Sequence, residues 1–261
     1  MNRLVLRKSV WNVKMLLVVA VSFAILVSPL VTNGMVEAFF KNGSVNVDLI
    51  SLQAYPFALS SFVIFAGMFP GIPYAYSYLE ERSSGYLKFI RLRMSRKKYA
   101  FQKIFYSGLS GGLSMLIPGI LIFALVDIMG VDTTPEQYPT VCDSMIWAPY
   151  LFIAGGRLIL ALKAILLFLF GVMWSEFSLL ISQLVRNRYA AFVLPFIIFE
   201  MLWLIAGGSI FNPIFLIRGD FENTYPLCTP YVVDIFYITV LVILNFSLLT
   251  RRKGFGNGGL G

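Results

Sequence analysis

The chain has 261 residues, of which 58% are hydrophobic and only 13% are charged, and its mean hydropathy is +0.80. Soluble domains are about 25% charged, and a soluble fold of this length could not bury so much apolar surface. The composition therefore excludes an ordinary soluble protein and predicts an all-α integral membrane protein. The net charge of +8 might suggest nucleic-acid binding. In a membrane protein, however, the positions of the basic residues along the chain are more informative than their total.

The first predicted element is a short interfacial helix over residues 2–13. Apolar residues there are interspersed with Arg3, Arg7 and Lys8, which suits a helix lying in the membrane surface. An irregular basic tail is the alternative. The apolar run that follows is long for a secretory signal, and no clear cleavage site comes after it, so it is interpreted as a retained span.

Six membrane-spanning helices are expected, over about 14–35, 50–77, 103–128, 158–183, 189–211 and 231–250. A helix needs roughly 20 apolar residues to cross the hydrocarbon, and its backbone must satisfy its own polar groups there. The glycines and prolines over 67–73 predict a kink in the second span. Glycine and serine recur over 107–114, which favours close helix packing by the third span.

Most lysines and arginines flank these spans on one side. That side would hold both termini, the loop over 79–102, and the connection that contains Arg186 and Arg188, whereas the other side holds Lys41 and Arg218. The positive-inside rule then places both termini in the cytoplasm. The outer loops, over 129–157 and 212–230, contain short apolar stretches that predict re-entrant or interfacial helices on the outer face.

The cytoplasmic loop over 79–102 is the most charged part of the chain, yet it also contains apolar residues. Its order of residues is a glutamate before a glycine, then a Ser-Arg pair, a tyrosine and a lysine that leads into the third span. In this sequence these are Glu81, Gly85, Ser95, Arg96, Tyr99 and Lys103. This order, together with six spans and cytoplasmic termini, resembles the membrane subunit of ABC-2-type transporters. The layout covers the whole chain, whereas the local motif covers residues 81–103 alone.

The resemblance implies a permease subunit of a bacterial ABC exporter in the cytoplasmic membrane. The loop would then form a coupling helix that rests on a separate cytosolic ATP-binding subunit. Its contact residues would be Glu81, Arg82, Gly85, Tyr86 and Phe89. The family also implies a second permease copy, identical or different, within the lipid bilayer. A hydrophobic or peptide-like cargo is the expectation.

The sequence contains no G-x-x-x-x-G-K-[ST] motif, so ATP and Mg²⁺ are expected on the partner ATPase, with no cofactor on this chain. The absence of histidine excludes His-based triads and nearly all zinc chemistry. Two other functions stay open. One is a stand-alone immunity or channel-like protein whose basic loop binds lipid. The other is an intramembrane enzyme that uses Glu176 and Glu200.

Four ionisable residues within the predicted spans are candidates for a translocation path. A charge at membrane depth costs at least a few kcal/mol and should face protein or water. The candidates are Arg157, Lys163, Glu176 and Glu200. Structural ion pairs, or side chains that reach the membrane surface, are the alternatives.

The two cysteines fall in the two outer loops. Cys142 precedes the fourth span and Cys228 precedes the sixth, so both would face the outer side. An oxidising environment there would permit a disulfide, and two free thiols are the alternative.

Overall fold

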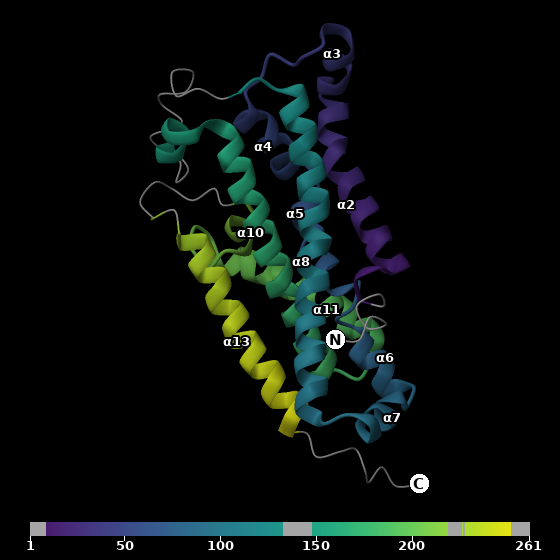
Figure 1. Cartoon of the computed structure of the whole chain (residues 1–261). Helices are drawn as coiled ribbons and strands as arrows, with labels where there is room; N and C mark the ends of the chain where they lie inside the picture. The colour runs from purple at the N-terminus through teal and green to yellow at the C-terminus, as the bar shows by residue number, and fades with distance from the viewer. Residues whose placement is uncertain (1–8, 133–147, 219–225, 227, 252–261) are drawn as a thin grey trace.

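The computed structural model of the chain describes residues 9–132, 148–218, 226 and 228–251 (Figure 1). These residues form helices and no strand, apart from one isolated bridge between Asp48 and Val131. The long helices are α2 (Val13–Thr32), α8 (Arg96–Met129), α10 (Ala148–Leu184), α11 (Arg188–Ala206) and α13 (Thr229–Arg251). The short ones are α3 (Met35–Asn42), α4 (Leu49–Leu59), α5 (Phe62–Phe65), η1 (Phe69–Gly71), α6 (Ser77–Ser83), α7 (Tyr86–Arg93) and α12 (Pro213–Arg218).

Five helices of the described part are long and apolar enough to cross a membrane. They are α2, α8, the part of α10 over Gly155–Leu184, α11 and α13. Only this part of α10 counts as a continuous helix, because the φ of +72° at Gly155 interrupts the helical backbone. The described residues thus form an all-helical structure that is consistent with a multi-pass membrane protein, and five of the six expected spans coincide with single long helices.

The expected span over 50–77 has a different form. It is divided among α4, α5, η1 and the start of α6, with an extended backbone at Ser60 between the first two. One kinked helix over this range was therefore the wrong expectation, because the chain breaks well before Pro70 as well as near it. Figure 1 shows the pieces following one another beside α8, from the end that carries α3 to the end that carries α6. Most of residues 66–75 are buried in protein, so their irregular backbone is shielded as it would have to be within a membrane.

The centre of the bundle is the pair α8 and α10, which have the most extensive contact between any two elements described. Small residues let the two backbones approach. A Cβ added at Gly171 would collide with the carbonyl group of Gly111, and one at Gly111 would collide with Ser175. The Ser175 hydroxyl also donates to the carbonyl of Ser107 at 2.8 Å. The close packing predicted for the glycine and serine positions of the third span is thus confirmed.

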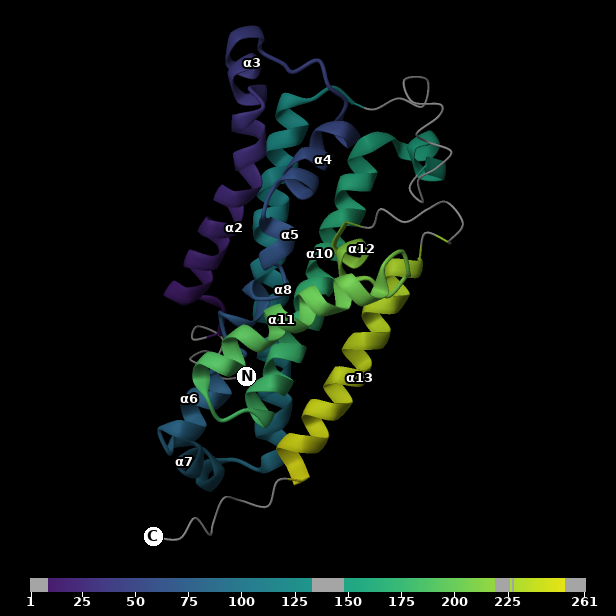
Figure 2. The same ribbon diagram turned by 180° about the vertical axis from the view of Figure 1, so that it is seen from behind.

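The remaining helices surround this pair. In Figure 1, α2 lies beside the half of α8 that ends at Met129, and α13 lies beside the half that begins at Arg96. In the reversed view of Figure 2, α11 and α12 lie in front of the α8–α10 pair. The short helix α12 and the helical turns before Gly155 correspond to the short helices predicted in the two outer loops.

Side-chain caps fix where three long helices begin. The side-chain oxygens of Asn12, Ser95 and Asn187 accept hydrogen bonds from backbone N–H groups in the first turns of α2, α8 and α11. Because α2 begins directly after Asn12 and residues 1–8 are not described, most of the interfacial helix predicted over 2–13 lies outside the described residues.

We use the name basic end for the end of the bundle formed by α6, α7, the start of α8 and the end of α13 (Figure 1). The loop with Arg186 joins this end, because the residue that opens α11, Arg188, contacts α6. The grouping of basic segments at one end is what the charge distribution predicts.

Candidate functional site at the basic end

A buried cluster joins α6 to the start of α8. The ammonium group of Lys103, whose side chain is 1% exposed, lies 2.9 Å from a carboxylate oxygen of Glu81. It also donates to the Ser77 hydroxyl at 2.6 Å and lies 4.6 Å from the ring centre of Tyr74. The second oxygen of Glu81 accepts a hydrogen bond from the Tyr99 hydroxyl at 2.6 Å. A buried pair of this kind is maintained only when further polar contacts satisfy both charges, and this cluster supplies them.

The local sequence explains why these side chains meet. Ser77 and Glu81 are four residues apart on α6, and Tyr99 and Lys103 are four residues apart on α8. Residues at i and i+4 lie on the same face of a helix, so each helix presents a pair to the other. The loop motif noted in the sequence therefore has a physical meaning, because three of its members form one cluster.

The four consecutive residues of α6 over 80–83 contact four different helices. The contacts are Glu80 with Lys14 of α2 at 2.8 Å, Glu81 with Lys103 of α8 at 2.9 Å, Arg82 with the carbonyl of Gln183 of α10 at 3.4 Å, and Ser83 with Arg188 of α11 at 2.5 Å. The Lys14 pair is half-exposed and adds little energy. The Lys103 pair is buried and fixes the position of α6. We call α6 with these contacts the α6 junction.

Helix α7 follows the junction and presents apolar side chains outward. Gly85, with a φ of +74°, provides the turn between α6 and α7. Leu87 packs inward, whereas Tyr86, Phe89 and Leu92 are exposed, Leu92 to 84%. Among the predicted contact residues, Glu81 is mostly buried in its pair with Lys103, Arg82 and Gly85 are partly exposed, and Tyr86 and Phe89 are the most open to a partner.

The other motif residues have simpler positions. Ser95 caps α8 by accepting a hydrogen bond from the N–H of Lys98, and Arg96 is exposed as the first residue of that helix. Arg82 is partly buried through its contact with α10.

The four candidates for a translocation path do not converge. Arg157 is exposed and donates to Asp127 of α8 at 2.8 Å, far along α8 from the basic end. Lys163 is buried on α10, and its ammonium group lies 3.4 Å from the amide oxygen of Gln53 on α4. Both residues thus join α10 to neighbouring elements, Arg157 through an ion pair and Lys163 through an amide.

Glu176 lies between α10 and α13, and its side chain is buried. Its Oε2 and its own backbone carbonyl both accept hydrogen bonds from the amide of Asn245, at 2.8 and 2.9 Å. Asn245 in turn accepts one from Gln183 at 2.5 Å. The Oε1 atom lies against the backbone of Gly108 on α8, and no described side chain donates to it.

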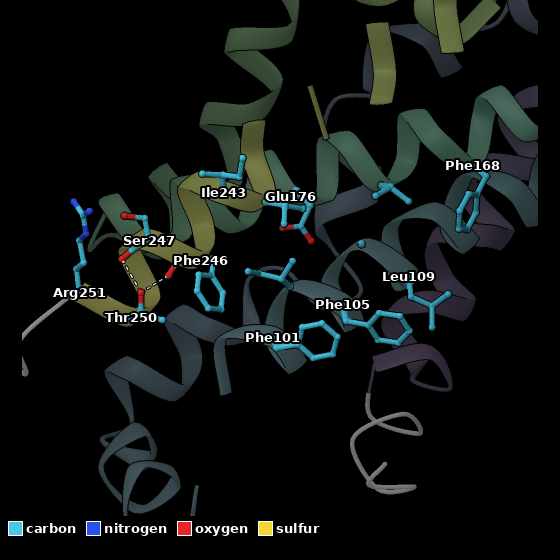
Figure 3. Close-up of a pocket in the computed structure, with 14 residues that line it drawn as sticks. Phe101, Phe105, Leu109, Phe168, Glu176, Ile243, Phe246, Ser247, Thr250 and Arg251 are labelled. Carbon is cyan, nitrogen blue, oxygen red and sulfur yellow. Dashed lines mark hydrogen bonds between the residues drawn. The ribbon is translucent and has the colours of Figure 1, made fainter. Parts of the chain in front are cut away.

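An open groove of about 780 Å³ runs beside Glu176, between α8, α10 and α13 (Figure 3). Its walls are aliphatic and aromatic side chains from all three helices. Glu176 lies in the wall and Arg251 lies at the rim, close to the basic end. The groove does not follow from the sequence, because it depends on the tilt of α13 relative to α8.

Glu200 and Asp234 are two further carboxylic acids in spanning helices. Glu200 is partly buried on α11, and no described residue donates to its Oε1. Asp234 on α13 is fully buried, and neither of its carboxylate oxygens has a hydrogen-bond partner among the described residues. Sequence reasoning missed Asp234, although the rule that singled out the other acids applies to it, since it lies within the span expected over 231–250.

The described contacts do not bring Glu200 and Glu176 together, and they lie on different helices. The predicted disulfide cannot be placed, since Cys142 lies outside the described residues, whereas Cys228 is exposed directly before α13. Within the described ranges, no group of three or more potential ligands could hold a metal ion.

Comparison with known proteins yields no relative: no family model, no curated protein and no solved structure matches this chain. The interpretation of the site therefore depends on its own geometry and on the residues described above.

Proposed function

We propose that the chain is the membrane subunit of a transporter driven by a separate cytosolic ATPase, of the ABC-2 type that its loop motif resembles. The observation that carries the proposal is the α6 junction. Four adjacent residues link one short helix to four long helices, and the next helix exposes apolar side chains.

The physical argument concerns how force could pass from a soluble partner to the membrane helices. A partner seated on Tyr86, Phe89 and Leu92 would press on α7, which connects to α6 through the single turn at Gly85. Because α6 is held by a buried ion pair on α8 and by contacts to α2, α10 and α11, its displacement would be shared among those helices. Packed elements of this kind move as units and do not deform continuously.

The basic end is proposed to face the cytoplasm, by the positive-inside rule. In this proposal the bilayer surrounds the five long helices and the divided segment over 49–77, which would be the sixth crossing. A second permease copy, in the bacterial cytoplasmic membrane, completes the transporter. A hydrophobic or peptide-like cargo remains the expectation of the resemblance, and ATP with Mg²⁺ would bind the partner.

Purification from the native membrane in mild detergent tests the proposal. The expected companion is a protein with a G-x-x-x-x-G-K-[ST] motif, in stoichiometric amount. Phe89→Glu should abolish the association, because it places a charge in the apolar contact. Tyr189→Glu is the matched control, since Tyr189 is 84% exposed on α11 and lies outside α7. A well-inserted Phe89→Glu protein that retains the ATPase would contradict the docking site, and the absence of any such ATPase would contradict the function.

A further inference from the structure

We propose that the groove between α8, α10 and α13 is a binding site for a hydrophobic cation, with Glu176 as its counter-charge. The inference is independent of the proposed ATPase coupling, because it concerns an equilibrium binding site on this chain alone. Its evidence is the lining of the groove, the state of the Glu176 carboxylate and the chemistry that these two features select.

The first observation is the half of the carboxylate that no side chain pairs. Asn245 donates to Oε2, whereas Oε1 lies against the backbone of Gly108 and no described side chain donates to it. Glu176 lies about eight residues inside α10 from its end at Leu184, or roughly 12 Å along the helix axis. An acid at such a depth is expected to face a path, a pocket or a partner charge. The described structure gives it a pocket and no cationic side chain.

The second observation is the aromatic lining. Four phenylalanines line the groove, namely Phe101 and Phe105 on α8, Phe168 on α10 and Phe246 on α13 (Figure 3). The faces of aromatic rings attract cations, and this attraction is largest where water is excluded. A groove that combines aromatic rings with a carboxylate in its wall suits alkylated or delocalised cations.

The form of the cation follows from the exposure of Glu176. Its side chain is 1% exposed, so its oxygens lie just beneath the groove surface. A ligand would therefore feel the charge across a few ångströms of apolar material and would form no direct hydrogen bond. This favours a quaternary or delocalised cation over a primary amine, because the former loses little hydration on entering an apolar site. The groove volume also lies within the roughly 300–1,000 Å³ that is typical of small-molecule sites.

Arg251 at the rim suggests a competing occupant, an anionic lipid whose phosphate contacts the arginine. That occupant would place its acyl chain along the apolar walls and would leave the Glu176 carboxylate without a counter-charge. We therefore favour the cation, because it accounts for the acid as well as for the phenylalanines, whereas the lipid accounts for Arg251 and the apolar walls but not for the acid.

A matched pair of probes tests the proposal. Tetraphenylphosphonium and tetraphenylborate have nearly the same size and shape and opposite charge. Equilibrium binding of each is measured with purified protein in phosphatidylcholine nanodiscs, without nucleotide, after subtraction of empty nanodiscs. We expect saturable binding of the phosphonium with a Kd at least tenfold lower than that of the borate. Equal binding of both probes, or preference for the borate, would overturn the proposal.

Two variants separate the roles of charge and space. Glu176→Gln retains the shape and the contact with Asn245, and should raise the Kd of the phosphonium at least tenfold. The control Asp234→Asn removes a buried carboxylate on α13, outside the groove, and should change the Kd less than twofold. Ile243→Trp fills the groove from an exposed position and should abolish saturable binding.

Ile243→Trp keeps the test decisive if Glu176→Gln fails to fold. Wild-type affinity in a folded Ile243→Trp protein would refute the site. So would a folded Glu176→Gln protein with unchanged affinity, or displacement of the phosphonium by phosphatidylglycerol that depends on Arg251 and not on Glu176.

Discussion

The side chain of Lys103 on α8 is only 1% exposed, and its Nζ lies 2.9 Å from Oε1 of Glu81 on α6. We predict that Lys103→Met destabilises the protein by about 3–5 kcal/mol, because it leaves the Glu81 carboxylate buried without a counter-charge. Adding Glu81→Gln to Lys103→Met should recover most of this loss. The free energy of unfolding in a denaturing detergent titration gives the complete double-mutant cycle.

The exposed pair on the same short helix is the control for this cycle. Lys14→Met removes the partner of Glu80, where both side chains are about half-exposed, and should cost less than about 1 kcal/mol. Equal costs for the Lys14 and Lys103 variants would mean that the buried cluster does not hold α6 in place.

A second prediction concerns the turn at Gly85. Gly85→Ala should destabilise α7 locally by about 1–2 kcal/mol, because a side chain disfavours its φ of +74° while the surrounding space is open. Gly208→Ala is the control, since that glycine also has open space and an ordinary φ. Hydrogen exchange should be at least several-fold faster in residues 86–93 of Gly85→Ala and unchanged in the control.

A third prediction concerns the contact of α8 with α10. Gly171→Ala should cost about 2–3 kcal/mol or more, because its Cβ would meet the backbone of Gly111, which cannot move alone. Gly119→Ala should cost less, because its Cβ would meet the flexible end of Leu167 at 2.5 Å. Thermal unfolding of both variants gives the comparison, and a larger loss for Gly119→Ala would contradict the packing described.

A fourth prediction tests the sidedness of the bundle. Phe40 on α3 and Leu92 on α7 are both highly exposed and lie at opposite ends of the molecule. In a background with Cys142→Ser and Cys228→Ser, an impermeant maleimide added to intact cells should label Phe40→Cys and not Leu92→Cys. Opening the cells should make both reactive. Labelling of both in intact cells would mean that the segment between them does not cross the membrane.

The sequence was most informative where a single physical rule governs a whole element. The five long helices follow from predominantly apolar length, and the α8–α10 contact follows from small residues at 107–114. The segment over 50–77 satisfies the same length rule, yet it forms several short helices. Its breaks at Ser60 and after Phe65 depend on packing against α8 and α10, which composition does not reveal.

For the functional residues too, the sequence indicates which residues matter but not how they are arranged. The motif residues Glu81, Tyr99 and Lys103 were identified from their order, but their arrangement in one cluster could not be, because it depends on how α6 lies against α8. The acids of the spans were identified by depth alone. Their partners, Asn245 for Glu176 above all, come from a different helix and could be found only from the assembled fold.

The divided segment over 49–77 has a consequence for the synthesis of this protein. Its irregular turns depend on α8 and α10 for shielding, yet the ribosome makes the segment before either helix. If it lies at membrane depth, it cannot be released into lipid as it emerges, and must wait beside the insertion machinery until α10 is complete. Nascent chains truncated at residue 95 should therefore leave this segment open to alkaline extraction or proteolysis, whereas chains truncated beyond Leu184 should protect it. Full protection of the shorter chain would show that the segment inserts by itself.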